Sequence, residues 1–120
     1  MPSQSRKRRG YESQAIVARF LAERGWPYAE PTGAGRQGSD IIGVLDIDVE
    51  VKGRTGFSPL AAMKQQAERG QDGRLPFAVL RMDGQGEAAI GAWPVVIRFD
   101  TFVGLLQAAG YGDGGEATDD

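Results

Sequence analysis

The chain has 120 residues, and its 14 Lys and Arg against 16 Asp and Glu give a formal net charge of −2. This length suits one domain with a single core of about four or five strands and a few helices. Because the chain has no cysteine and no histidine, disulfides, zinc–thiolate sites, cysteine nucleophiles and histidine bases are excluded. Any chemistry must therefore use carboxylates, lysine and hydroxyls, which favours hard cations such as Mg²⁺ or Mn²⁺.

The two ends of the chain carry opposite charges, with four consecutive cations near the start and four acidic residues near the end: Arg6, Lys7, Arg8 and Arg9, and Asp113, Glu116, Asp119 and Asp120. Charged segments with few apolar residues are typical of disorder. We therefore expect a disordered basic tail over 1–10, one ordered domain over 11–111 and a disordered acidic tail over 112–120. No apolar run approaches the ~18 residues of a membrane span, so we expect a cytoplasmic protein without a membrane partner.

The first half of the chain predicts one helix and three strands. Apolar spacing indicates an amphipathic helix over about 11–24, and a short strand within 26–31 follows it. A glycine-rich loop over 32–40 leads into strands 40–44 and 46–53. These two strands are separated only by a tight turn near Leu45, which predicts a hairpin.

The second half predicts a helix, two strands and a last helix. Ser58 as N-cap and Pro59 at the first helical position indicate a helix up to Gly70. Apolar strands are expected at 75–83 and 92–99, and an amphipathic helix at 100–110. This order describes an α/β domain with a mixed central sheet and flanking helices.

The predicted hairpin places carboxylates opposite one another. A turn about Leu45 sets Asp40 across from Glu50, with Lys52 two residues further along the same face. Directly opposed carboxylates repel unless a cation lies between them, so a divalent metal is expected there. Glu12 is spaced by four from Ile16 and by eight from Phe20, so we expect it to point inward as a third carboxylate.

These residues resemble the motif of the PD-(D/E)XK nuclease superfamily. The chain has "SD" at 39–40, nine intervening residues, and "EVK" at 50–52, with Ser where the superfamily name has Pro. The helix with Glu12, the Gly and Ser loop, and a later helix with "KQQ" occur in the order found in archaeal-type Holliday junction resolvases. The resemblance implies a restriction-endonuclease-like core with the order αβββαβ plus a C-terminal strand and helix, in a prokaryotic cell or a phage-infected host.

The resemblance also implies an Mg²⁺-dependent endodeoxyribonuclease, in which Mn²⁺ can substitute. Asp40, Glu50 and the Val51 backbone carbonyl would bind the metal, and Glu12 would bind it through a water. Lys52 would assist the attacking water, and Gln66, or Gln65 beside it, would position the nucleophile or Lys52. We expect contacts to DNA phosphates from eight residues: Arg6, Lys7, Arg8, Arg9, Arg36, Ser39, Arg54 and Lys64.

A resolvase nicks two equivalent strands of a four-way junction, in DNA recombination and repair, whereas one carboxylate cluster cuts one strand at a time. A homodimer with two-fold symmetry, its two metal sites facing the same side, meets that demand. We expect part of 92–111 to form its interface, because this segment has more apolar residues than one core contact needs: Trp93, Val95, Ile97, Phe99, Phe102, Val103, Leu105 and Leu106.

Other interpretations stay open. The charged residues of 46–52 suit the solvated face of a hairpin, and Glu12 suits the start of any helix. The basic tail suits a solubilising arm, and the glycine-rich loop suits phosphate binding, although it lacks the Lys-Ser/Thr ending. The alternative functions are another nuclease of the superfamily, of restriction type or acting on single strands, and a non-catalytic nucleic-acid-binding module with the same fold.

Overall fold

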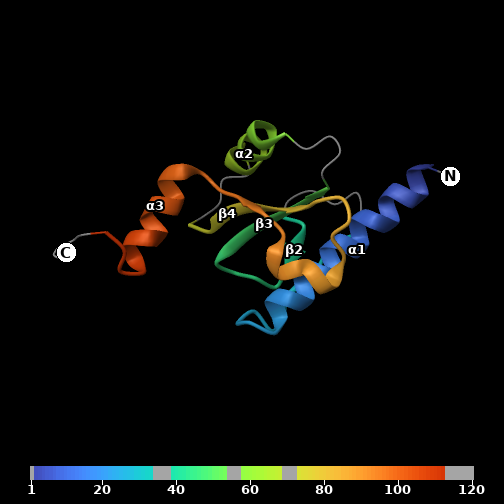
Figure 1. Cartoon of the computed structure of the whole chain (residues 1–120), viewed down its shortest axis with the longest axis horizontal. Coiled ribbons are helices and arrows are strands. Elements are labelled where there is room, and N and C mark those ends of the chain that lie inside the picture. Colours follow the sequence, from blue (N-terminus) through green and yellow to red (C-terminus); the bar gives the residue numbers. More distant parts are fainter. Residues whose placement is uncertain (1, 34–38, 54–57, 69–72, 113–120) are drawn as a thin grey trace.

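A computed structural model describes residues 2–33, 39–53, 58–68 and 73–112 of the chain. Within these ranges it contains three α-helices, five strands and a 3₁₀ helix (Figure 1), in the order α1 (Pro2–Ala22), β1 (Glu30–Pro31), β2 (Ile41–Ile42), β3 (Ile47–Gly53), α2 (Pro59–Glu68), β4 (Leu75–Arg81), η1 (Glu87–Ala92), β5 (Val95–Val96) and α3 (Phe99–Ala108). The described helices include none that is long and apolar enough to cross a membrane.

The sheet is mixed, as the sequence predicted. β3 and β4 pair in parallel over their full length, from Ile47 opposite Leu75 to Gly53 opposite Arg81. β5 then pairs antiparallel to β4. Because parallel neighbours need a crossover connection, α2 lies between β3 and β4 in the sequence. The predicted α/β class with flanking helices is therefore confirmed.

The predicted hairpin is wrong. β2 pairs with β1, where Ile42 lies opposite Glu30, while β3 pairs with β4. Both residues of the short strand β2 pair with β1, so no ladder forms between β2 and β3, while β3 pairs with β4 along its other edge. A remnant of the expected pairing survives, because the backbone N–H of Asp40 donates to the carbonyl of Val49 at 2.9 Å.

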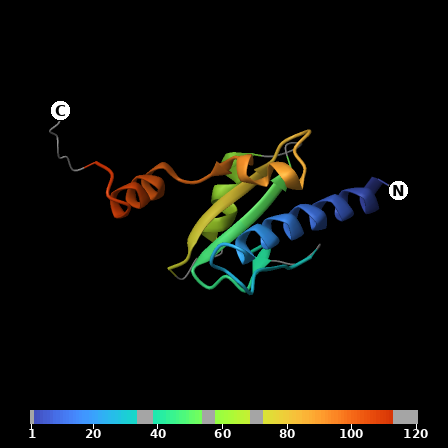
Figure 2. The same ribbon diagram turned by 60° about the horizontal axis from the view of Figure 1, so that its bottom comes forward.

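The two faces of the β3–β4 pair are covered by different helices. α1 and α2 lie on opposite sides of it (Figures 1 and 2). Ile16 and Val17 of α1 share the main hydrophobic core with Val49 of β3 and Val79 of β4. Since side chains alternate along a strand, Asp48, Glu50 and Lys52 belong to the opposite face, on the side of α2.

Helix α1 is longer than predicted. It begins at Pro2 and not near residue 11, so residues 2–10, which were expected to be disordered, continue the helix. Arg, Lys and Gln are good helix formers, and a helix nucleated by its packed half propagates at low cost. Figure 2 shows the N-terminal part of α1 projecting past the sheet. The expected acidic tail, apart from Gly112, lies outside the described residues.

The start of α2 and the segment after β4 test finer predictions. The Ser58 hydroxyl accepts a hydrogen bond from the backbone N–H of Ala61 at 3.2 Å, so the predicted N-cap is confirmed. The strand expected at 92–99 is reduced to β5, and η1, which the sequence did not predict, precedes it. Trp93 between them is buried in the core, so within the segment 92–111 it offers little surface to a dimer interface.

Candidate active site

Asp40 is fixed against β3 by its backbone and its side chain. Its N–H donates to the Val49 carbonyl at 2.9 Å, and its Oδ2 accepts from the backbone N–H of Val51 at 2.7 Å. Its own carbonyl accepts from the backbone N–H of Thr32 at 2.9 Å. Val49 and Val51 flank Glu50, so Asp40 is bonded to the residue on either side of Glu50, although no hairpin ladder forms.

Glu50 and Lys52 form an ion pair on the same face of β3. Lys52 Nζ lies 3.4 Å from Glu50 Oε2, with the Glu50 side chain 5% exposed and that of Lys52 36% exposed. A buried carboxylate is costly unless a charge or hydrogen bonds compensate it. The Glu50 carboxylate is therefore buried, and the Lys52 side chain that pairs with it reaches the surface.

Asp48 is a buried acidic residue that the sequence prediction did not select. It is completely buried, and Oδ1 accepts a hydrogen bond from the Ser39 hydroxyl. Ser39 was expected to contact DNA, but it is itself buried and directed into the protein, so that expectation is wrong. The bond ties the residue before Asp40 to β3. The alternation of charged and apolar residues over 46–52 is typical of a strand with one solvated face, so the sequence did not signal this burial.

Glu12 does not point inward as expected. Its side chain is 58% exposed, and its Oε1 lies 3.4 Å from Arg81 Nη1. Arg81 also donates to the Ser13 hydroxyl at 3.0 Å and lies over the ring of Trp93, on the α1 side of the sheet. Glu12 thus lies on α1, across the sheet from the Glu50 side chain. The helical spacing was correct, but position 12 falls beyond the buried part of α1.

The acidic residues near β3 can supply a magnesium ion with only a few protein ligands. In the described ranges no three acidic residues gather closely enough to hold a metal ion together. Mg²⁺, however, usually keeps several waters and takes one or two protein carboxylates plus substrate phosphates. Asp40, Glu50 and the Val51 carbonyl supply hard oxygen ligands of that kind, so the residues fit the metal that the sequence implied.

The other predicted site residues are exposed or lie outside the description. Lys64 and Gln65 are exposed on α2, and the side chain of Gln66 on the same helix is not described. Arg8 and Arg9 are exposed on α1. The remaining predicted DNA contacts fall outside the described residues or side chains: Arg6, Lys7, Arg36 and Arg54.

The clearest pKa shifts belong to surface ion pairs away from this site. Arg19 of α1 donates two hydrogen bonds to Glu87 of η1, at 2.8 and 2.9 Å, and these lower the pKa of the Glu87 carboxyl. Arg98 donates to Asp100 at the start of α3 and lowers the pKa of that carboxyl in the same way. The first pair links α1 to η1, and the second stays within one turn of chain.

Comparison with known proteins gives no independent indication of function, since no family model, curated protein or solved structure matches the chain.

Proposed function

We propose that the protein is a metal-dependent DNA endonuclease with a restriction-endonuclease-like core of the PD-(D/E)XK type. The observation that carries the proposal is the gathering of three motif residues at one edge of β3: Asp40 bonds to both neighbours of Glu50, and Glu50 lies 3.4 Å from Lys52. Two acids can supply oxygen ligands for a metal, and a lysine can supply a cation for the phosphate, which is chemistry that a chain without histidine or cysteine can use.

Each residue has a defined task in this proposal. Asp40 and Glu50, with the Val51 carbonyl, hold Mg²⁺, which when bound would lower the pKa of a water and shield the phosphate charge. Lys52 reaches the surface from its buried partner, so its ammonium group can stabilise charge that develops on the phosphate. Asp48 and Ser39 keep the preceding residues against β3 and thereby orient Asp40.

The proposed substrate is branched DNA, nicked at symmetric strands of a four-way junction by a homodimer. Phosphate contacts position a protein on DNA without reading its sequence, which suits an enzyme that selects branched DNA by its shape. The exposed Arg8 and Arg9 on the projecting part of α1 and the exposed Lys64 on α2 supply cations for phosphates, which carry no sequence information.

A non-catalytic DNA-binding module is the second candidate, favoured by the absence of a three-carboxylate cluster among the described residues. One experiment separates the two. The protein is incubated with Mg²⁺ and labelled four-way junction, duplex and single-stranded DNA, with Glu50→Gln as the inactive variant and Glu23→Gln, an exposed acid in the turn after α1, as the matched control. We expect symmetric junction nicks from the wild type and the control only. Binding of DNA without cleavage in Mg²⁺ or Mn²⁺ would establish the binding module instead.

A further inference from the structure

Helix α3 has an apolar side that the rest of the chain covers only in part: Phe99 and Phe102 are exposed, while Val103 and Leu106 are half-buried. Phe99, Phe102, Val103 and Leu106 follow the spacing i, i+3, i+4, i+7, which places them on one side of a helix. None of the α3 residues is buried, and Phe99 is 81% exposed. Figure 1 shows α3 standing apart from the sheet, joined to it by the segment after β5. A ten-residue helix is only marginally stable in water unless it packs against another surface.

A shallow apolar groove lies where α3 leaves the body of the protein. Its volume is about 590 Å³, and it is lined from α2 and from the segment joining β5 to α3: Pro59, Leu60, Met63, Val96, Ile97, Arg98, Phe99 and Asp100. Leu60 on its rim is 82% exposed. Arg98 and Asp100 pair with each other at 2.7 Å, so no unbalanced charge remains among the lining residues to attract a nucleic acid or an anionic lipid surface.

The helix of the same chain is badly placed to fill this groove. α3 starts at the groove, since Phe99 and Asp100 line it, and the backbone N–H of Phe102 already bonds to the Arg98 carbonyl at 2.9 Å. Arg98 itself is extended, with φ −61° and ψ 141°. The segment "VIRFD" has no Gly or Pro to reverse the chain there. The apolar side of α3 is therefore led away from the groove beside which it begins.

We propose that two copies of the chain exchange α3, each helix lying in the groove of the other copy. Helix and groove are both apolar, and every copy has both. A dimer with two-fold symmetry therefore covers the helix and the groove of each copy. The proposal deepens the homodimer of the proposed function by naming its contact. It leaves out Trp93, which is buried, and adds Leu60 and Met63 of α2, which the sequence did not indicate.

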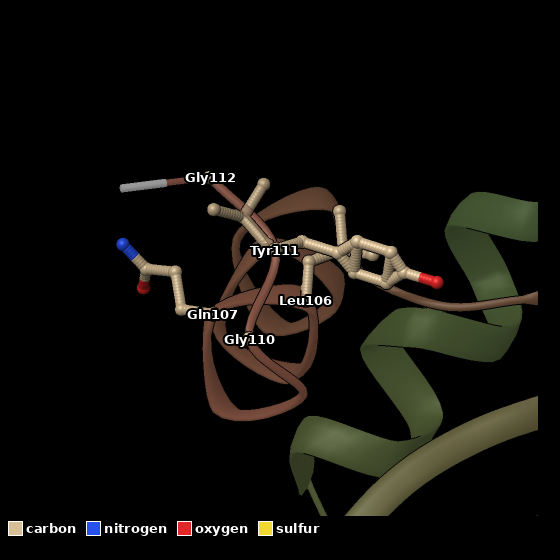
Figure 3. Close-up of a pocket in the computed structure, with 6 residues that line it drawn as sticks. Leu106, Gln107, Gly110, Tyr111 and Gly112 are labelled. Atoms are coloured by element: carbon tan, nitrogen blue, oxygen red, sulfur yellow. The ribbon is translucent and has the colours of Figure 1, made fainter. Parts of the chain in front are cut away.

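The end of α3 presents a further feature that this contact would use. Gly110, at φ +95°, ends the helix, and the Tyr111 N–H donates to the Leu106 carbonyl at 2.9 Å. Tyr111 is exposed beside a second hollow of about 410 Å³ at the helix end. In Figure 3 the Tyr111 ring and the Gln107 side chain point in opposite directions. The Tyr111 ring thus lies beside the hollow that Val103 and Leu106 of α3 also line.

The test is the mass of the full chain in solution, without DNA or metal, by sedimentation equilibrium at micromolar concentrations. We expect a dimer. Leu106→Asp, on the apolar side of α3, and Leu60→Asp, in the groove, should each raise the dissociation constant of the dimer about 100-fold or more. The reason is that the symmetric dimer buries each of these leucines twice, once from each copy. Ala108→Asp and Ala61→Asp add the same charge to the same two helices at exposed positions away from the contact and should leave the dimer intact.

Mixing the variants tests the exchange itself. The Leu106→Asp variant keeps an intact groove, and the Leu60→Asp variant keeps an intact α3. An equimolar mixture should therefore form a heterodimer, whereas each variant alone should stay monomeric. Circular dichroism confirms folding, and Phe102→Gln replaces Leu106→Asp if that helix is lost. A monomeric wild type would overturn the proposed exchange of α3. The cleavage assay tests the proposed nuclease activity separately. A dimer unaffected by Leu60→Asp would overturn the groove contact, and failure of the mixture to associate would overturn the exchange.

Discussion

The Oδ2 atom of Asp40 lies 2.7 Å from the backbone nitrogen of Val51, whose N–H it accepts. The residue proposed as a metal ligand is therefore also a structural link between the segment before β2 and strand β3. A substitution at this position changes two properties at once, and an isosteric amide separates them because its oxygen can still accept the Val51 N–H.

We expect Asp40→Asn and Asp40→Ala to abolish Mg²⁺-dependent cleavage but to differ in stability. Both lose the ligand charge, whereas only the alanine variant loses the acceptor for Val51, which should cost about 1 kcal/mol of unfolding free energy. Cleavage of labelled junctions and urea denaturation measure the two effects. Wild-type cleavage by both variants would reject Asp40 as a ligand.

Lys52 and Lys64 should affect different steps. Lys52→Ala removes the cation 3.4 Å from the buried Glu50 carboxylate, so we expect junction binding with little or no cutting, even at saturating DNA. Lys64 is exposed on α2, and Lys64→Ala should weaken binding while cleavage at saturation stays near that of the wild type. Single-turnover rates and binding titrations distinguish these results. Equal effects of both variants on the cleavage rate would contradict the assignment of Lys52.

Glu12 provides a test in which sequence and structure give different expectations. The resemblance implied a water-mediated metal ligand, but the structure pairs Glu12 with Arg81 on the α1 side of the sheet. We therefore expect Glu12→Gln to reduce cleavage by less than about tenfold, whereas loss of an acid–base or ligand role typically costs ~100-fold or more. A loss as large as that of Glu50→Gln would return Glu12 to the metal site.

The sequence predicted the α/β class because that class follows from local patterns, whereas the placement of Asp40 opposite Glu50 was derived from a hairpin that does not form. Strand alternation and helix caps are properties of a few neighbouring residues, as the Ser58 cap shows. The choice of strand partners is not local. β3 pairs with β4, which begins 22 residues after β3 ends, and no pattern within β3 indicates that partner.

Burial at the site was also hidden from the sequence. Asp48 and Glu50 alternate with apolar residues, which is typical of a strand with one solvated face. In the structure both acidic residues are buried, because the parallel pair is covered on both sides. For α3 the sequence overestimated burial. Some of its apolar residues were expected to make a core contact, but none of the α3 residues is buried. Packing between distant segments decides both cases.

The Arg19–Glu87 pair predicts a small, pH-dependent contribution to stability. Hydrogen bonds from Arg19 lower the pKa of Glu87 in the folded state. A carboxyl with a lowered folded-state pKa stabilises the fold above its ordinary pKa and loses that contribution as the pH falls through the lowered value. Glu87→Gln should therefore melt slightly below the wild type at neutral pH, with the difference vanishing in strong acid. Because both side chains are exposed, added salt should shrink it. A difference that grows with acidity would contradict this pairing.

The basic part of α1 predicts how DNA binding responds to salt. Arg8 and Arg9 are exposed on a helix that projects past the sheet, so they approach phosphates as a helical arm and not as a loose tail. Each phosphate neutralised contributes about 0.9 to the slope of log K against log salt. We expect the double variant Arg8→Gln, Arg9→Gln to weaken junction binding and to reduce the slope by up to about 2, and deletion of residues 1–9 to reduce it further. Arg24→Gln, in the turn that follows the opposite end of α1, is the control and should leave the slope unchanged. If the double variant and the deletion both keep the wild-type slope, the arm makes no phosphate contacts and its charge serves solubility alone.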